Sequence, residues 1–300
     1  MFASTSQNYE GHDEYVYMIA VSKDGQLMAT ASGDDTVIVW DVRRRVAVHA
    51  LQHDAAVYAA AISPDGRSIA TGGGDGRVTL WNAQNGHRIE SVSQHGDAVY
   101  CVDYSPDGKL LASAGGSTDG GDTVCRIRRT ADLELVSEFS GHSLQVYGVV
   151  FSPDGQTVVT SSGDRTIRRW NVGTGESSVL TGHTSDVYRC AFTPDGKRLA
   201  STSQDGTVRV WDLQTNQGTV LFDGSKKNPM YAVRFTRDGK RLAAVGDDRR
   251  LRIWAVDESS LLSDTRVAPC ALYSVAILPD DSTIVTAGED GIVYTVPAPK

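Results

Sequence analysis

Histidine, hydroxyl and aspartate side chains recur along this chain at spacings that would suit nucleophilic chemistry. Thr30 stands four residues before Asp34, which stands six residues before Trp40, and a histidine precedes each such set. A histidine, a hydroxyl and a carboxylate are the components of a nucleophilic triad. The set occurs four times, each time with a tryptophan, whereas an enzyme needs one such centre, so we predict a structural role and no catalytic residues. The four sets are His12, Thr30, Asp34 and Trp40; His53, Thr71, Asp75 and Trp81; His142, Thr160, Asp164 and Trp170; and His183, Ser201, Asp205 and Trp211.

A repeated tyrosine reveals the larger unit that positions these residues. Consecutive tyrosines of the series are separated by 41, 42, 47, 41, 43 and 42 residues. A period of this length indicates a solenoid, a propeller or another repeat array. The series is Tyr17, Tyr58, Tyr100, Tyr147, Tyr188, Tyr231 and Tyr273.

Each copy of the repeat has the pattern of four short strands. In the fourth copy, Asp154-Gly155 separates two alternating apolar runs, residues 146–151 and 157–160. This pattern is typical of a hairpin, because glycine accepts the positive φ of a tight turn. Two further runs follow, residues 166–170 and 178–180. The sequence therefore predicts an all-β fold built from seven four-stranded antiparallel units.

The ends of the copies resemble those of the WD40-repeat family. Trp40-Asp41 and Trp211-Asp212 end two copies, and Gly-His pairs stand at Gly11-His12, Gly141-His142 and Gly182-His183. The resemblance covers essentially the whole chain and implies a seven-bladed β-propeller, with residues 1–300 forming a single domain. Physical reasoning agrees, because a blade exposes two apolar faces and only a closed ring of neighbours buries all of them.

The same resemblance implies that each set of His, Ser or Thr, Asp and Trp forms a hydrogen-bonded tetrad inside its blade. Each such buried bond stabilises the fold by about 0.5–1.5 kcal/mol. Blade six has Lys226 in the histidine position and Ala244 in the hydroxyl position, while blades three and seven have Ile127 and Val296 in the tryptophan position. We therefore expect complete tetrads in blades one, two, four and five. We also expect loss of Asp248 in blade six to matter less than loss of an aspartate in a complete tetrad.

The two ends of the chain indicate how the ring closes. After the third strand of the last copy, residues 292–296, only residues 297–300 remain, and these are too short and too rich in proline for another strand. We predict that roughly residues 2–8 supply the outer strand of blade seven, which removes an open sheet edge.

The repeated tyrosines are predicted to line one mouth of a central channel. Apolar residues of the first strand fall four, seven and nine residues after the histidine, as Val187, Cys190 and Phe192 do in blade five. A step of three within a period of two requires a β-bulge. The apolar residues then face neighbouring blades, so the tyrosine and the residue three beyond it face the channel. The rings form either a plug or an aromatic collar for a cationic side chain, a peptide or a small ligand.

The residues three beyond the tyrosines are predicted to line the channel interior. Most of them are small, but Asp103 and Arg234 carry opposite charges and come from blades nearly across the ring. The full set is Ala20, Ala61, Asp103, Val150, Ala191, Arg234 and Ala276.

Composition and charge exclude several classes of protein. The net charge of −8 over 300 residues argues against a nucleic-acid-binding surface. No apolar run approaches the roughly 18 residues of a membrane span, and the chain has no signal-peptide pattern at its start. The four cysteines form no Cys-x-x-Cys motif and are typical of a reducing compartment, so we predict a cytoplasmic protein. They are Cys101, Cys125, Cys190 and Cys270.

The sequence predicts neither a metal site nor a cofactor. The histidines outside the repeated positions, His49 and His87, lie far apart in their repeats. Residues 119–122 are rich in oxygen ligands but lack further ligands at the offsets of a calcium loop.

The features together favour a binding platform. We expect a monomeric, non-catalytic scaffold or adaptor that binds protein or peptide partners on the tyrosine face and at the channel mouth. The alternative is a small-molecule receptor or an enzyme that uses the channel mouth, because a fold alone does not determine function.

Overall fold

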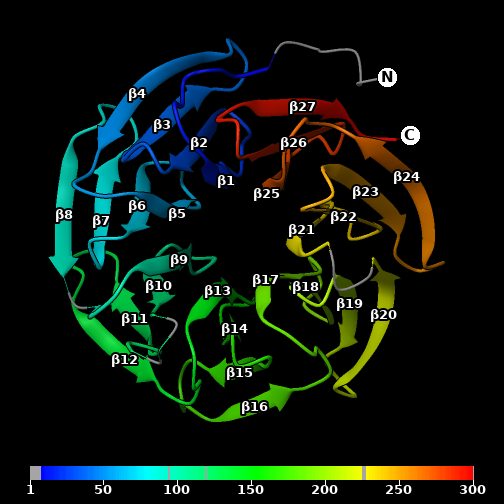
Figure 1. Cartoon of the computed structure of the whole chain (residues 1–300). Helices are drawn as coiled ribbons and strands as arrows, with labels where there is room; N and C mark the ends of the chain where they lie inside the picture. The colour runs from blue at the N-terminus through cyan, green and yellow to red at the C-terminus, as the bar shows by residue number, and fades with distance from the viewer. Residues whose placement is uncertain (1–7, 94, 118, 120, 225–227, 300) are drawn as a thin grey trace.

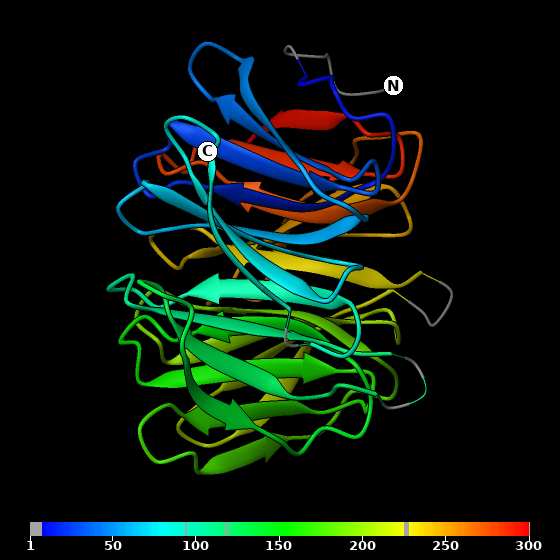
Figure 2. The same cartoon turned by 90° about the vertical axis from the view of Figure 1, so that its left-hand side faces the viewer.

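The seven predicted blades surround a central channel in the computed structural model, which describes residues 8–93, 95–117, 119, 121–224 and 228–299. Each blade is an antiparallel sheet, and the sheets follow one another around a closed ring (Figure 1). From the side, the strands run roughly along the channel axis (Figure 2). The predicted all-β, seven-bladed propeller is confirmed. The described part of the chain contains no helix with the length and apolar character needed to cross a membrane.

Every blade places its first strand against the channel and the following strands progressively further out (Figure 1). The first strands are β1 (Val16–Val21), β5 (Val57–Ile62), β9 (Val99–Tyr104), β13 (Val146–Phe151), β17 (Val187–Phe192), β21 (Met230–Phe235) and β25 (Leu272–Ile277). The second strands are β2 (Leu27–Ser32), β6 (Ser68–Gly73), β10 (Leu110–Gly115), β14 (Thr157–Ser162), β18 (Arg198–Ser203), β22 (Arg241–Gly246) and β26 (Thr283–Gly288).

The third and fourth strands form the outer part of the ring. The third strands are β3 (Thr36–Asp41), β7 (Arg77–Asn82), β11 (Cys125–Arg129), β15 (Ile167–Asn171), β19 (Thr207–Asp212), β23 (Arg250–Ala255) and β27 (Val293–Pro297). The fourth strands are β4 (Val46–Gln52), β8 (Arg88–Ser93), β12 (Leu135–Phe139), β16 (Ser177–Leu180), β20 (Gln217–Asp223) and β24 (Ser260–Arg266).

The hydrophobic core is divided among the junctions between neighbouring blades. At the junction of blades four and five, Val159 and Ile167 pack with Val187, Leu199 and Trp211. Six further clusters of described residues each join two consecutive blades, including blades seven and one. Full burial of one such side chain stabilises the fold by about 1.5–3 kcal/mol. Each blade therefore depends on both neighbours, which is why the ring has to close.

A β-bulge lies at the repeated tyrosine of every first strand. In blade four, Val146 pairs with Ser162 and Gly148 pairs with Ser161, so Tyr147 between them is the extra residue. The other six first strands shift register at the same position. The predicted bulge is confirmed, and it turns the tyrosine side chain away from the blade junction.

The Asp-Gly turn between first and second strands is held by the aspartate side chain. Asp154 accepts hydrogen bonds from the hydroxyl of Ser152 at 2.5 Å and from the backbone N–H of Gln156 at 3.0 Å. Gly155 has a φ of 71°, in the left-handed region that favours glycine. In blade seven, Asp281 takes the equivalent conformation at a φ of 54°. This turn sets the register of the strand that carries the tyrosine.

Within the described residues, blade seven contains three strands, β25, β26 and β27, and Tyr9 pairs with the outer edge of β27. Tyr9 and Val293 exchange two backbone hydrogen bonds of 3.0 Å. The Tyr9 ring packs edge-on against Trp40, with 5.3 Å between centroids. Of the strand predicted at residues 2–8, only Asn8 lies within the described residues, so closure by that strand stays a prediction.

Deletion of residues 1–10 removes Tyr9 with its backbone bonds to Val293 and its packing on Trp40. We expect a lower melting temperature and concentration-dependent self-association, because the edge of β27 loses its partner. Thermal unfolding and size-exclusion chromatography with light scattering measure both effects. The control Tyr9→Ala keeps the backbone pairing and should lower the melting temperature less, without self-association. A truncated protein that melts and elutes like the full chain would contradict the closure.

Candidate functional site

Blades one, four and five contain the complete hydrogen-bonded tetrad. In blade five, Nε1 of Trp211 donates to Oγ of Ser201 at 2.9 Å, and this oxygen lies 2.7 Å from Nε2 of His183. Nδ1 of His183 lies 2.9 Å from Oδ2 of Asp205. Burial opposes ionisation of Asp205, but bonds from His183 and Thr207 outweigh it and hold the pKa of this carboxyl well below its usual range. Blades one and four repeat the arrangement with separations of 2.7–2.9 Å. Both ring nitrogens of each histidine are therefore engaged within the blade.

Blade two was expected to hold a complete tetrad, and the structure corrects one of its bonds. Nε1 of Trp81 donates to Oγ1 of Thr71 at 3.0 Å, and Nε2 of His53 lies 2.8 Å from the same oxygen. Nδ1 of His53, however, lies 3.0 Å from the carbonyl oxygen of Leu51 instead of bonding to Asp75. The Asp75 carboxylate accepts a bond from the backbone N–H two residues further on. Burial lowers the pKa of His53, which favours the neutral ring.

Blade three contains a tetrad-like network that sequence reasoning missed. Nε2 of His95 lies 2.9 Å from Oγ of Ser113, and Nδ1 lies 3.0 Å from Oδ2 of Asp122. Arg126 also donates to the Asp122 carboxylate, at 2.6 Å. Ser113 follows His95 by 18 residues, the spacing of histidine and hydroxyl in all four predicted sets. That spacing was the available signal, whereas the insertion lengthened the spacing from hydroxyl to aspartate from four residues to nine.

The tryptophan position of blade three is occupied by Arg128, and its assignment to Ile127 was wrong. Arg128 lies opposite Leu111 in the strand pairing, as Trp40 lies opposite Met28 in blade one. The Arg128 side chain is buried, and Nη1 donates to a backbone carbonyl oxygen at 3.0 Å. The insertion lies before Asp122, and Arg128 follows Asp122 by six residues, which is the spacing from aspartate to tryptophan in the four predicted sets.

In blade six, Asp248 has a charged partner that the sequence pattern did not reveal. Nη2 of Arg252 donates to Asp248 at 2.5 Å. Arg252 is buried and lies over the ring of Phe222, 4.4 Å from its centroid. Loss of Asp248 would leave this guanidinium without its nearest carboxylate. This contact argues against the expectation that loss of Asp248 destabilises the protein less than loss of an aspartate in a complete tetrad. The predicted departure at Lys226 lies outside the described residues.

The seven repeated tyrosines form an unbroken circle of ring contacts, which we call the tyrosine collar. Each ring is half-buried and packs against the rings of both neighbouring blades. The centroid separations are 5.1 Å for Tyr17–Tyr58, 5.3 Å for Tyr58–Tyr100, 5.7 Å for Tyr100–Tyr147, 5.1 Å for Tyr147–Tyr188, 5.3 Å for Tyr188–Tyr231, 5.1 Å for Tyr231–Tyr273 and 5.9 Å for Tyr17–Tyr273. Tyr17–Tyr273 is stacked and the other pairs are tilted or edge-on, and all the separations are typical of aromatic pairs. The collar is thus a preformed circle of contacts.

Polar side chains hold several collar hydroxyls in place. The hydroxyl of Tyr147 donates to Asp186 at 3.2 Å, and that of Tyr273 donates to Glu289 at 3.0 Å. The hydroxyl of Tyr188 donates to Gln204. Burial raises the pKa of Tyr147 to about 12, so this ring is neutral at physiological pH.

Acidic side chains surround the collar, and we call them the acidic lip. Their negative charges raise the pKa of collar tyrosines, in addition to the larger effect of burial. The lip residues are Asp97, Asp186, Asp247 and Glu289. No pattern in the sequence predicted this lip.

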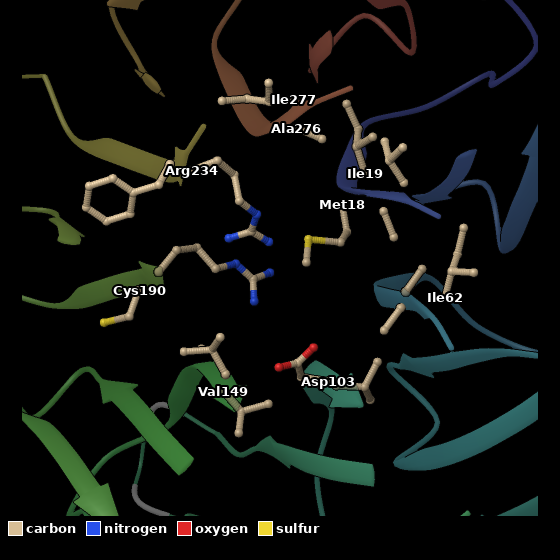
Figure 3. A pocket seen from close by; sticks show the side chains of 18 residues that line it. Met18, Ile19, Ile62, Asp103, Val149, Cys190, Arg234, Ala276 and Ile277 are labelled. Atoms are coloured by element: carbon tan, nitrogen blue, oxygen red, sulfur yellow. The ribbon is translucent and has the colours of Figure 1, made fainter. Parts of the chain in front are cut away.

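Beyond the collar, the channel interior contains a cavity of about 250 Å³. Asp103 and Arg234 line it, and their charged groups point toward its centre from different sides (Figure 3). The backbone N–H of Phe151 donates to the Asp103 carboxylate at 2.8 Å. Burial raises the pKa of Asp103 to about 6, although this bond and the charge of Arg234 act in the opposite direction.

A second arginine of the cavity, Arg189, was missed because the bulge changes which side chains face inward. Its Nη1 donates to the carbonyl oxygen of Tyr147 at 2.8 Å, and its Nη2 donates to that of Tyr100 at 3.3 Å. Arg189 thereby links the first strands of three blades. Gly148 permits the approach, since a Cβ there would lie 2.8 Å from the carbonyl oxygen of Tyr188. The sequence did contain a feature that could have identified Arg189, because it is the only charged residue directly after a collar tyrosine.

The cysteines and the acidic groups form no separate chemical centre. All four cysteines are free, and burial raises the pKa of Cys101 and Cys190 to about 12, so these thiols are protonated. Over the residues that the structure describes, no group of three or more His, Cys, Asp or Glu side chains is arranged to hold a metal ion.

The two kinds of blade allow a matched test of the tetrad. Asp205→Ala removes the partner of a buried histidine and should lower the free energy of unfolding by about 1–3 kcal/mol. Asp75→Ala should cost clearly less, because His53 does not depend on this carboxylate. Denaturant titration of both variants measures the difference. Equal losses would show that the His–Asp bond is not what stabilises the blade.

Comparison with models of protein families agrees with the geometry. Residues 56–296 match the model described as the IFT122 first beta-propeller, and residues 3–41 match the model described as the WD domain, G-beta repeat. No curated protein matches the chain. The first match covers more than half of the sequence, and the WD40 resemblance is confirmed. WD40 propellers are typically protein-interaction scaffolds and are generally non-catalytic. The chain belongs to the IFT122 first β-propeller family of WD40 propellers.

Proposed function

We propose that this propeller is a non-catalytic scaffold that binds protein or peptide partners at the tyrosine collar. The closed circle of ring contacts is the observation that carries the proposal. Centroid separations of 5.1–5.9 Å around seven rings place the channel axis about 6 Å from every centroid. This is about the outer limit of the distance at which a cation over the face of an aromatic ring is attracted to it. One Arg or Lys side chain on the axis would be within reach of all seven rings.

The acidic lip supports a cationic visitor. Asp186 and Glu289 accept bonds from collar hydroxyls, so their negative charges lie at the channel mouth. A net charge of −8 on the whole chain adds a longer-range attraction for basic segments. Lip and rings therefore favour the same kind of side chain.

Preorganisation is the second support for a binding role. Each collar ring is braced by its two neighbours, and the hydroxyls of Tyr147, Tyr188 and Tyr273 are bonded to side chains of the rim. Side chains that are already ordered lose little conformational entropy when a partner binds. An additional exposed ring, Tyr15, packs on Tyr17 and Tyr273 and widens the aromatic surface.

A small-molecule receptor or an enzyme at the channel mouth is the second candidate. The histidine and hydroxyl groups of the complete tetrads are engaged in bonds within their blades, which leaves the scaffold role better supported than catalysis. A metabolite that raises the melting temperature would favour the receptor, whereas protein partners recovered by affinity capture favour the scaffold.

We further propose that the protein acts as a monomer in the cytoplasm, without nucleic-acid or membrane partners and without a cofactor. Closure of the apolar junctions around the ring, free cysteines and a net negative charge support these properties.

The double variant Tyr147→Ala/Tyr188→Ala tests the collar directly. It should bind its partner about 2 kcal/mol or more weakly if these rings are hot spots, while folding nearly as well as the wild type, since both rings face the channel. Arrays of basic and acidic peptides, followed by fluorescence polarisation on the tightest binder, supply the measurement. Basic peptides are expected to bind and acidic ones not to.

Two control variants locate the recognition surface. Tyr147→Phe/Tyr188→Phe keeps the rings and should retain most of the affinity. Leu261→Ala/Leu262→Ala removes two exposed apolar side chains of the outer strand β24 and should have no effect. Affinity that falls with the β24 variant and not with the alanine collar variant would move the recognition surface to the outer rim.

A further inference from the structure

We propose that the channel interior is a binding site for a small oxyanion of the phosphate or carboxylate class. The site consists of the guanidinium groups of Arg189 and Arg234 and the Asp103 carboxylate, all of which line the cavity. Figure 3 shows the charged groups of Arg234 and Asp103 pointing toward its centre from different sides. The inference goes beyond the protein-binding role, because it uses the cavity past the collar and not the collar rings.

The cavity carries an excess of positive charge. Two arginines and one aspartate are the charged side chains that line it. Among the described residues around the cavity, Asp103 is not within ion-pair distance of either arginine, although its charge and that of Arg234 act on each other. Burial lowers the pKa of Arg189, and the charge of Arg234 lowers it further. Arginine nevertheless stays protonated in proteins. Two like charges that face one cavity are stabilised by an anion between them.

The donor groups match an oxyanion. Each guanidinium has five N–H donors in a planar fork, which suits carboxylate and phosphate oxygens. Arg189 uses donors for the carbonyl oxygens of Tyr147 and Tyr100, and Arg234 donates to the carbonyl oxygen of Val233 at 3.1 Å. These bonds fix the orientation of the two guanidinium groups. Each guanidinium keeps more N–H donors for a ligand than it uses in these bonds.

Small side chains provide the space and limit the size of the ligand. The residues that correspond to Asp103 and Arg234 in four other blades line the cavity and are small or apolar. They are Ala20, Ala61, Val150 and Ala276. A volume of about 250 Å³ accommodates inorganic phosphate or a small organic acid but not a folded partner. Apolar walls also lower the local dielectric constant, which strengthens the attraction between guanidinium and anion.

The negative charge of Asp103 repels a bound anion. Removal of this charge should therefore raise the affinity for the anion, whereas removal of an arginine should lower it. Replacement of Asp103 by asparagine removes the negative charge and keeps a carbonyl oxygen that accepts the Phe151 N–H. The variant should bind the anion more tightly than the wild type. A partly unfolded protein would not bind more tightly, so this result cannot arise from damage to the fold.

Isothermal titration calorimetry with inorganic phosphate and with citrate, at constant ionic strength set by chloride, measures the site. We expect one saturable site in the wild type. Arg234→Gln should weaken binding about tenfold or more, and Asp103→Asn should strengthen it severalfold. Arg234→Lys keeps the charge without the fork and should fall between wild type and Arg234→Gln.

A surface arginine provides the matched control. Arg129 is exposed and paired with Asp132 and Glu134, so Arg129→Gln removes the same charge far from the cavity and should leave affinity unchanged. Equal weakening by Arg129→Gln would reduce the effect to surface electrostatics and overturn the proposal. Absence of saturable binding in both the wild type and Asp103→Asn would also overturn it. The variant Tyr147→Ala/Tyr188→Ala retains both cavity arginines and should still bind phosphate, which separates failure of this site from failure of the collar.

Discussion

The packing of apolar side chains between neighbouring blades is the interaction on which the rest of the molecule depends. No blade keeps a core for itself, since each cluster of buried residues belongs to two consecutive blades. A blade removed from the ring would expose both of its apolar faces. Closure also fixes the radius of the channel, and with it the separations between the seven tyrosine rings. The collar is therefore a consequence of blade packing, although its rings take no part in that packing.

Hydrogen bonding inside the blades is more variable than the packing around them. Blades one, four and five use the complete tetrad, blade two redirects one bond of His53, and blade three brings in Arg126 and Arg128. Blade six pairs Asp248 with Arg252. Each of these solutions gives the buried histidine, aspartate or arginine at least one partner, which is the physical requirement that the fold imposes. The identity of the residues matters less than the satisfaction of the groups.

The channel has three chemically distinct zones along its axis. Carboxylates such as Asp186 surround the mouth, aromatic rings follow, and the guanidinium groups of Arg189 and Arg234 line the interior. A cation is favoured at the first two zones and an anion at the third. This order of charges suits a scaffold that engages a basic side chain at its mouth and a small anion inside, at sites that can be altered independently.

Local patterns in the sequence were sufficient for the fold and for the collar. Strand alternation, Asp-Gly turns and the repeat period depend on neighbouring residues, and the step of three after His183 revealed the bulge that turns Tyr188 inward. The channel position of Asp103 and Arg234 followed from the same step. Only the tertiary structure decided which distant groups meet. The reach of Arg189 to the carbonyl oxygens of Tyr147 and Tyr100 depends on the approach of two other blades. The partners of His53 and Asp248 lie only two and four residues away, and side-chain direction decided which of the nearby groups they meet. Contacts between blades have no fixed sequence spacing, because the closed ring and not the local chain sets the distance between the strands.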